Sequence, residues 1–251
     1  MNQTAAGRRF LKAEAWEEWQ ASGHASDQSK GLPAPPAQRP VPAGAVVVAL
    51  PAADTLTPAE LPLVEAIRQR RSHRRYTDAA LTLAELSFLL WATQGVREAR
   101  DSARVFRTVP SAGCRHALET YLVVSRVEGL APGLYRYQPL EHQLCRLGED
   151  ANLAGRTAQA CHGQRFVANA AVTFVWTAVP YRMEWRYTLV SPKLIALDAG
   201  HVCQNLYLAC AAIGAGTCAV AAYSQREIDA LLGVDGEEEF TVYLAPVGKV
   251  V

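Results

Sequence analysis

The chain has 251 residues, enough for one sizeable hydrophobic core or two small domains. Half of the residues are hydrophobic and a fifth are charged, an ordinary globular composition that excludes an intrinsically disordered chain. The formal net charge is +1, so no overall field favours nucleic acid or an anionic membrane as a partner. Any basic binding site must therefore be local.

The cysteines and the apolar segments indicate a cytoplasmic protein. Six cysteines occur without a CxxC pair and without the Cys/His spacing of a zinc or other metal site. Arg8 and Arg9 are followed by acidic residues instead of an apolar stretch, which argues against an export signal. The apolar stretch 202–222 contains Gln204 and Asn205, so we expect a buried helix and strand there instead of a membrane span. Reduced thiols and a cytoplasmic location are the expectation.

The first 56 residues differ in composition from the rest of the chain. Six prolines fall between positions 33 and 51, and proline neither donates a backbone hydrogen bond nor tolerates a helical neighbour before it. We therefore expect an extended, proline-rich arm over residues 1–56 and a folded domain over residues 57–251. Two interpretations of the arm stay open: a floppy tail, or a segment that wraps a partner subunit through Trp16 and Trp19.

Capping signals predict three helices. Residues 57–60 and 82–85 each form a capping box, and Ser224 opens a short helix that ends at Gly233. Gly95 ends the second helix. In the first two helices we expect these side chains to face inward: Leu61, Val64 and Ile67 in the first, and Leu86, Leu89, Leu90 and Thr93 in the second.

Runs of β-branched and aromatic residues predict a central sheet. The expected strands are residues 121–127, a hairpin of 133–137 with 143–147, and residues 171–179, 217–223 and 240–247. A helix of about sixteen residues is expected from near Asp198 to Ile213. Helices and strands mix without strict βαβ alternation, which predicts an α+β fold with one central sheet.

The basic segment 70–75, with the sequence RRSHRR, is the sharpest local feature of the chain. Arginine guanidinium groups match phosphate oxygens in a bidentate geometry, and Ser72 adds a hydroxyl donor. Each charge-assisted hydrogen bond contributes roughly 1.5–3 kcal/mol. The alternative is a solvated basic helix end that interacts with its own helix dipole.

Two turns of small residues, 109–113 and 214–217, would let the backbone approach a flat ligand closely. Neither fits a GxGxxG dinucleotide fingerprint, and no P-loop sequence occurs. The histidines share no spacing, and no Ser/His/Asp set can be assembled. The residues therefore suggest a phosphate-bearing cofactor held outside the two commonest nucleotide-binding motifs.

Six segments in this order resemble the nitroreductase superfamily of flavoproteins, and more narrowly its SagB-type branch, which includes thiazoline- and oxazoline-oxidising dehydrogenases. The segments are residues 70–76, 89–95, 107–113, 133–137, 199–208 and 231–236. The resemblance runs from about residue 60 to the C-terminus. It implies a nitroreductase-like FMN-binding fold, with a central, mostly antiparallel sheet flanked by helices, in an intertwined homodimer that binds FMN at the subunit interface.

The resemblance also implies which residues contact FMN. The basic segment would hold the phosphate and the ribityl chain, the loop 110–116 would reach the flavin of the other subunit, and the backbone of 219–222 would run along the ring. A cation near the C-terminus would complete the set. The implied cofactor-binding residues are Arg70, Arg71, Ser72, Arg74, Pro110, Ser111, Ala112, Gly113, Cys114, His116, Ala219, Val220, Ala221, Ala222 and Lys249.

The function implied by the resemblance is ping-pong hydride transfer through FMN between NAD(P)H and a small organic substrate. One alternative is an azoline dehydrogenase that acts on a modified peptide, and another is a non-catalytic flavin-binding protein. In azole-forming members a lysine followed by tyrosine is tied to azoline oxidation. Lys193 matches that lysine and is the candidate catalytic residue; the alternative is a solvent-exposed lysine without a catalytic role. Leu194 replaces the tyrosine and puts azole formation in doubt.

Overall fold

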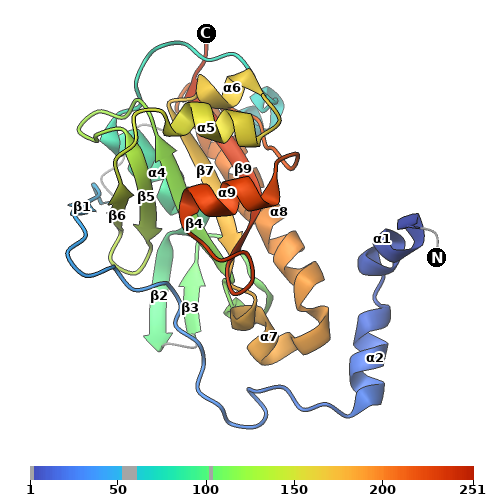
Figure 1. The fold of residues 1–251 in the computed structure, drawn as a ribbon. Coiled ribbons are helices and arrows are strands. Elements are labelled where there is room, and N and C mark those ends of the chain that lie inside the picture. The colour runs from blue at the N-terminus through green and yellow to red at the C-terminus, as the bar shows by residue number, and fades with distance from the viewer. Residues whose placement is uncertain (1–2, 53–60, 102–103) are drawn as a thin grey trace.

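The computed structural model describes residues 3–52, 61–101 and 104–251. Within these ranges one seven-stranded sheet has the order β1-β6-β5-β4-β7-β9-β8, and all of its neighbouring pairs are antiparallel (Figure 1). This confirms the expected α+β class. The strands are β1 (Val47–Ala49), β4 (Leu118–Val124), β5 (Gly133–Gln138), β6 (Gln143–Gly148), β7 (Val172–Ala178), β8 (Ala215–Thr217) and β9 (Phe240–Lys249). A separate hairpin joins β2 (Val96–Asp101) to β3 (Arg104–Arg107).

Helices cover both faces of the sheet. Helices α4 (Leu83–Gln94) and α8 (Ser191–Ala212) lie on one face, and α5 (Leu153–Ala160), α6 (Arg165–Ala168) and α9 (Gln225–Leu232) lie on the other (Figure 1). The short helices α3 (Leu63–Gln69) and α7 (Tyr181–Tyr187) contact α8, and a 3-10 turn, η3 (Thr188–Val190), leads into it. The central strands β4 and β7 are buried along their whole length because both of their faces are covered.

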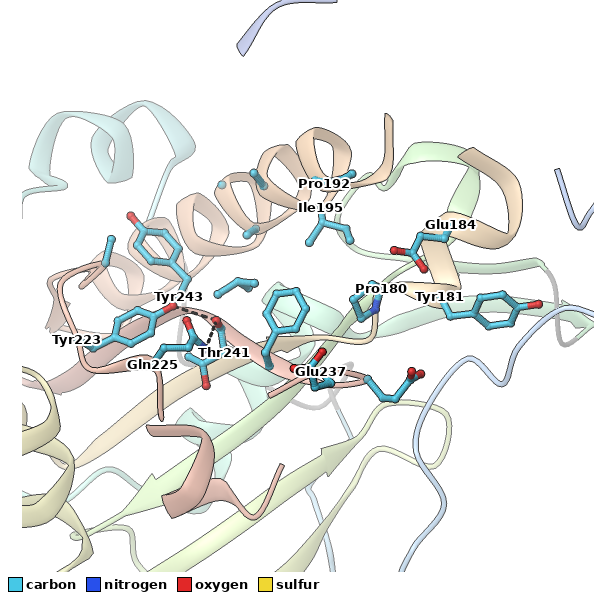
Figure 2. Close-up of a pocket in the computed structure, with 17 residues that line it drawn as sticks. Pro180, Tyr181, Glu184, Pro192, Ile195, Tyr223, Gln225, Glu237, Thr241 and Tyr243 are labelled. Atoms are coloured by element: carbon cyan, nitrogen blue, oxygen red, sulfur yellow. Dashed lines mark hydrogen bonds between the residues drawn. The ribbon is translucent and has the colours of Figure 1, made fainter. Parts of the chain in front are cut away.

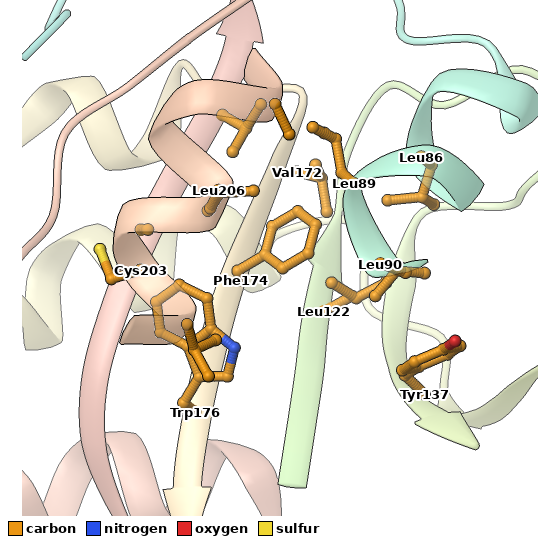
Figure 3. Packing of buried hydrophobic residues seen from close by; sticks show 14 of the residues in the cluster. Leu86, Leu89, Leu90, Leu122, Tyr137, Val172, Phe174, Trp176, Cys203 and Leu206 are labelled. Carbon is orange, nitrogen blue, oxygen red and sulfur yellow. The ribbon is translucent and has the colours of Figure 1, made fainter. Parts of the chain in front are cut away.

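The larger core lies between the sheet and the pair α4 and α8. Leucines of α4 meet Phe174 and Leu122 of the sheet, and Leu206 and Cys203 of α8 pack beside Trp176 (Figure 3). All of these side chains are nearly inaccessible to solvent. The core therefore fixes α8, which carries Asp198 and Tyr207, against the sheet.

Three predicted elements agree closely with the structure. The helix that begins after Thr82 has a complete capping box and ends at Gly95. The hairpin of β5 and β6 forms with the expected pairing. Helix α9 ends at Gly233, whose φ of 73° is the left-handed conformation that favours glycine at this position.

Several boundaries were predicted wrongly. The helix expected from Asp198 begins at Ser191, because Pro192 sits in its first turn, where a missing backbone N–H costs nothing. The strand expected over residues 121–127 is β4, which begins and ends three residues earlier. The strand expected over 217–223 ends at Thr217, and beyond it a single bridge joins Val220 to Leu244.

The first predicted helix differs more strongly. Its capping box at residues 57–60 lies outside the described residues. Helix α3 begins at Leu63 after Pro62, and it buries Ala66. Two of the three side chains expected to face inward are exposed instead, Val64 at 53% and Ile67 at 58%, whereas Leu61 is partly buried. Leu63, which was not expected on that face, is 66% exposed. Within the described residues, nothing covers the apolar side chains Leu63, Val64 and Ile67 of this helix.

The N-terminal arm is not extended throughout. Residues Gln3–Leu11 and Glu14–Ser22 form helices α1 and α2, because the prolines begin only at Pro33 and the preceding segment is rich in alanine, glutamate and glutamine. Figure 1 shows these helices at one side of the molecule, joined to β1 by a long segment without regular structure. Trp16 contacts Trp19 and Tyr187 of the same chain, at 5.7 Å and 6.0 Å between ring centroids.

Hydrogen bonds hold the proline-rich part of the arm on the body. Arg107 donates to the carbonyl of Ala37 at 2.9 Å, and the backbone N–H of Arg39 donates to Glu119 at 2.7 Å. The indole of Trp185 donates to the carbonyl of Leu32 at 3.1 Å. These contacts argue against a floppy tail. In the ranges that the structure covers, no helix is both long and apolar enough to cross a membrane.

Candidate functional site

The basic segment follows α3 and runs beside β8. Arg70 ends α3, and the backbone N–H of His73 donates to the carbonyl of Thr217 at 2.9 Å. Gly216 is required there, because a Cβ at this position would lie 2.6 Å from the His73 ring. A hollow of about 320 Å³ lies between the segment and the turn that precedes β8. Two segments that the sequence singled out separately therefore form one surface.

The arginines of this segment are available to an anion. Arg71 and Arg74 are exposed, and Arg70 is half-buried with its guanidinium 5.5 Å from the centre of the Tyr207 ring. Among the described residues, no carboxylate forms an ion pair with Arg70, Arg71, Arg74 or Arg75. Other exposed arginines, such as Arg68 one turn earlier, do have a carboxylate partner. The charge of the basic segment is thus uncompensated locally, as a phosphate site requires.

Tyr207 of α8 joins the basic segment to the segment 219–222. Its hydroxyl lies 3.1 Å from Ser72 Oγ and accepts a hydrogen bond from the backbone N–H of Ala219 at 2.8 Å. Val220 then pairs with Leu244, and Ala221 and Ala222 are exposed. Sequence reasoning omitted Tyr207 from the site, although it lies in one of the segments that carry the family resemblance.

A hollow of about 910 Å³ opens beside Ala221, between the first half of α8 and β9 (Figure 2). Its walls are largely apolar and aromatic, and they include Ile195, Phe240 and Tyr243. Among the described residues that line it, the charged ones are carboxylates, namely Glu184, Glu237 and Glu238. Burial, together with the nearby charge of Glu238, raises the pKa of Glu184. The hollow adjoins the 219–222 segment and carries negative charge.

The loop 110–116 is fixed to the first half of α8. Ser111 Oγ donates to Asp198 at 2.5 Å, and the backbone N–H of Ala112 donates to the same carboxylate at 3.4 Å. Gly113 and Cys114 lie in the 3-10 turn η2 (Ala112–Cys114). Asp198 and Tyr207 are nine positions apart on α8, a rise of about 13.5 Å along the helix axis. A single chain therefore does not bring this loop to the basic segment.

Three residues expected at the site have partners within their own chain. His116 is buried, and its burial together with the charge of Arg107 lowers its pKa to about 2. Lys249 forms an ion pair with Glu85 and donates to the carbonyl of Ile213 at 2.8 Å. Lys193 donates to the carbonyls of Leu11 and Lys12, so it faces the N-terminal helices instead of the larger hollow.

These features agree with the comparison to a known family of proteins. Residues 67–249 match the model of the nitroreductase family. The chain belongs to the nitroreductase family. A relative from Methanocaldococcus jannaschii that carries the name nitroreductase is 35% identical over 190 residues, which are 76% of this chain and 92% of the relative.

Solved structures give the same result at the level of the fold. A nitroreductase from Ralstonia eutropha JMP134 is 29% identical, with a TM-score of 0.68 over 88% of this chain and 99% of the other. A nitroreductase from Desulfovibrio desulfuricans, solved in complex with FMN, is 19% identical, with a TM-score of 0.53 over 75% of this chain and 86% of the other. An NADPH:FMN oxidoreductase from Vibrio harveyi, complexed with NAD+, is 19% identical, with a TM-score of 0.53 over 74% of this chain and 68% of the other. The nitroreductase-like α+β fold expected from the sequence is confirmed.

Proposed function

We propose that this member of the nitroreductase family is an FMN-dependent oxidoreductase that transfers hydride by a ping-pong mechanism between NAD(P)H and a small organic substrate. The observation that carries the proposal is the basic segment. Its arginines have no carboxylate partner in the part of the chain that the structure describes, and Tyr207 links the segment to Ala219. The FMN bound to the Desulfovibrio relative and the NAD+ bound to the Vibrio relative support the choice of cofactor and of reductant.

We assign the phosphate and ribityl chain of FMN to Arg70, Arg71, Ser72 and Arg74. The arginines supply charge-assisted donors, and Ser72 supplies a hydroxyl whose position is set by Tyr207. The segment Ala219, Val220, Ala221 and Ala222 fits a flat ring, because its small side chains let the backbone come close. Bound FMN supplies the hydride chemistry, and the protein supplies binding, orientation and electrostatics.

We propose that the active form is a homodimer with FMN sites at the interface, in which Pro110, Ser111, Ala112, Gly113 and Cys114 reach the flavin of the partner. Asp198, which holds the loop, and Tyr207, which contacts the basic segment, are separated by about 13.5 Å along α8. This separation supports a dimer, because the loop does not meet the basic segment of its own chain. The exposed apolar face of α3 also supports a partner. We leave His116 and Lys249 out of the set of contacts, because both are engaged inside their own chain.

The hollow beside Ala221 is the place we propose for the small organic substrate. Its carboxylates would repel an anionic group, so we expect neutral or cationic substrates to be preferred there. We also propose that residues 57–251 form the flavin-binding domain and that residues 1–56 are an added arm. The family match over residues 67–249 supports that division.

A SagB-type assignment is a narrower proposal with less support. Lys193 contacts α1, and the residue after it is Leu194 instead of the tyrosine found in azole-forming members. Two results together would favour this assignment over the reductase. An azoline-containing peptide would be turned over and would bleach the flavin, and Lys193→Ala would abolish that turnover.

The proposal is tested first by the visible absorbance spectrum of the purified protein, followed by anaerobic addition of NADH or NADPH. We expect a yellow protein that bleaches. A yellow protein that neither nucleotide bleaches would favour the azoline dehydrogenase if an azoline peptide reduces it, and a non-catalytic flavoprotein if nothing does. A colourless protein that cannot be reconstituted with FMN would overturn the proposal.

The phosphate assignment has its own test. The double variant Arg70→Ala/Arg74→Ala should lose FMN affinity by at least a hundredfold, because two charge-assisted contacts disappear. The control Arg75→Ala/Arg226→Ala removes the same amount of charge outside the proposed contacts and should bind FMN within a few-fold of the unmodified protein. Equal loss in both variants would point to a general charge effect and against a specific phosphate site.

A further inference from the structure

The loop between Ser111 and His116 has an unusual backbone. Gly113 and Cys114 both have a φ of 56°, and His116 has a φ of 46°. The left-handed region is unfavourable for residues with a Cβ, so Cys114 and His116 hold this conformation only because their surroundings impose it. Such residues often lie at functional sites, where a fixed backbone is part of the mechanism.

Asp198 anchors the beginning of this loop. One carboxylate oxygen accepts from Ser111 Oγ at 2.5 Å, and the other accepts from the backbone N–H of Ala112 at 3.4 Å. Ser111 Oγ in turn accepts from the backbone N–H of His116 at 2.9 Å, so the two ends of the loop are joined. Asp198 is 5% exposed, and among the described residues no lysine or arginine forms an ion pair with it. Its hydrogen-bond donors come from the loop.

The outer side of the loop meets a second element. Arg115 donates to the carbonyl of Gly113 at 3.0 Å, and its guanidinium lies 4.9 Å from the ring centre of Trp185 on α7. A Cβ at Gly113 would lie 2.7 Å from the Tyr187 hydroxyl, which leaves space for glycine alone. The loop is thus held between α7 and α8, and Asp198 is its link to α8.

We propose that Asp198 is a positioning residue for the flavin site of the partner subunit. This inference rests on the proposed function, in which Ser111–Cys114 of one protomer reach the FMN bound to the basic segment of the other. Asp198 fixes that loop to α8 in a single conformation. Tyr207, further along the same helix, contacts the basic segment of its own chain. Helix α8 thereby connects the FMN site at the basic segment of its own protomer with the loop that reaches the FMN of the partner.

The first test is FMN affinity, measured by fluorescence titration on the full-length dimer. Asp198→Ala and Ser111→Ala should each weaken FMN binding by roughly tenfold to a hundredfold, because each removes the charge-assisted bond between loop and helix. The double variant should lose little more than Ser111→Ala alone, since Asp198 acts through the loop that Ser111 anchors. If Asp198→Ala does not fold, Ser111→Ala and Asp198→Asn carry the same test.

The control is Asp229→Ala on the opposite face of the sheet. Asp229 is equally buried and also binds a backbone N–H, that of Thr241, at 2.8 Å. This variant should be less stable to heat, but when folded its FMN affinity should stay within about threefold of that of the unmodified protein. Unchanged FMN affinity in Asp198→Ala and Ser111→Ala would overturn the inference. The proposed function would stand in that case if Arg70→Ala/Arg74→Ala still lost FMN.

A mixed dimer distinguishes action on the partner from a local structural role. One protomer carries Asp198→Ala, and the other carries Arg70→Ala/Arg74→Ala, with two affinity tags to isolate the heterodimer. If Asp198 acts on the partner's flavin, one of the two sites has an intact basic segment and an intact loop, and the dimer should bind one FMN with unmodified affinity. If Asp198 acts on the flavin of its own chain, neither site is intact and tight binding is lost, which overturns the inference. Absence of FMN binding by the unmodified dimer would overturn both this inference and the proposed function.

Discussion

Ser72 and Tyr207 are 135 positions apart in the sequence, and their hydroxyl oxygens lie 3.1 Å from each other. The same Tyr207 hydroxyl accepts from the backbone N–H of Ala219 at 2.8 Å. One side chain of α8 therefore sets the relative positions of a basic segment and a segment of small residues. This relationship makes the two segments a single candidate site.

Removing the Tyr207 hydroxyl should loosen that site. In Tyr207→Phe, Ser72 loses a partner and the Ala219 N–H loses its acceptor, so we expect FMN affinity to fall by about fivefold to tenfold. Tyr135→Phe is the matched control, because its hydroxyl donates to the carbonyl of Ala131 on a distant part of the sheet. Isothermal titration of FMN into both apoproteins measures the effect. Equal affinities would remove Tyr207 from the site.

Lys249 is expected to contribute to stability and not to FMN binding. Its ion pair with Glu85 is largely buried, and Glu85 also completes the capping box of α4. Lys249→Met should lower the free energy of unfolding by about 1–3 kcal/mol, because a half-buried carboxylate loses its partner. Urea unfolding measures the loss, and adding Glu85→Gln should restore part of it. A tenfold weaker FMN affinity in Lys249→Met would instead support the cofactor contact that the sequence resemblance implies.

His116 should make the protein less stable in acid. Burial and the charge of Arg107 lower its pKa to about 2 in the folded state, whereas an unperturbed histidine has a pKa of about 6.5. Below pH 6.5 the unfolded chain therefore binds one more proton at this position than the folded chain, and stability falls as the pH falls towards 2.

The size of this effect follows from the pKa difference. Between about pH 6.5 and about pH 5, His116 should contribute a loss of about 2 kcal/mol in the free energy of unfolding. Urea unfolding of His116→Asn should show a correspondingly weaker dependence on pH than that of the unmodified protein. An identical dependence in His116→Asn and the unmodified protein would contradict the assignment.

Lys193 is expected to hold the N-terminal helices. Its ammonium group donates to the carbonyls of Leu11 and Lys12 at the end of α1. Lys193→Met should therefore increase the rate of tryptic cleavage in the first twelve residues several-fold, because local opening becomes easier, while the rate of flavin reduction stays within twofold. Lys30→Met, which breaks an exposed ion pair elsewhere in the arm, is the control. Slower flavin reduction with unchanged proteolysis would place Lys193 in catalysis.

Local signals in the sequence were sufficient for several elements. The capping box at Thr82 and the glycine at position 233 act within a few residues, and the hairpin of β5 and β6 joins neighbouring strands. They were predicted correctly because the interactions that form them are close in sequence. The start of α8 was predicted too late: the helix begins at Ser191, and Pro192 lies in its first turn, where proline is tolerated.

The sequence by itself determined the family, the α+β class and the basic segment as the candidate phosphate site. The tertiary structure decided which of these residues meet. The order β4-β7-β9-β8 brings strands that are distant in sequence together, and α8 packs on the face of the sheet that α4 also covers. Asp198 is thereby placed against Ser111 and Tyr207 against Ser72, whereas Lys249 and Lys193 receive partners that no local pattern specifies. Contacts across 80 or more positions depend on the packing of the whole core, and short-range patterns in a single sequence carry no information about them.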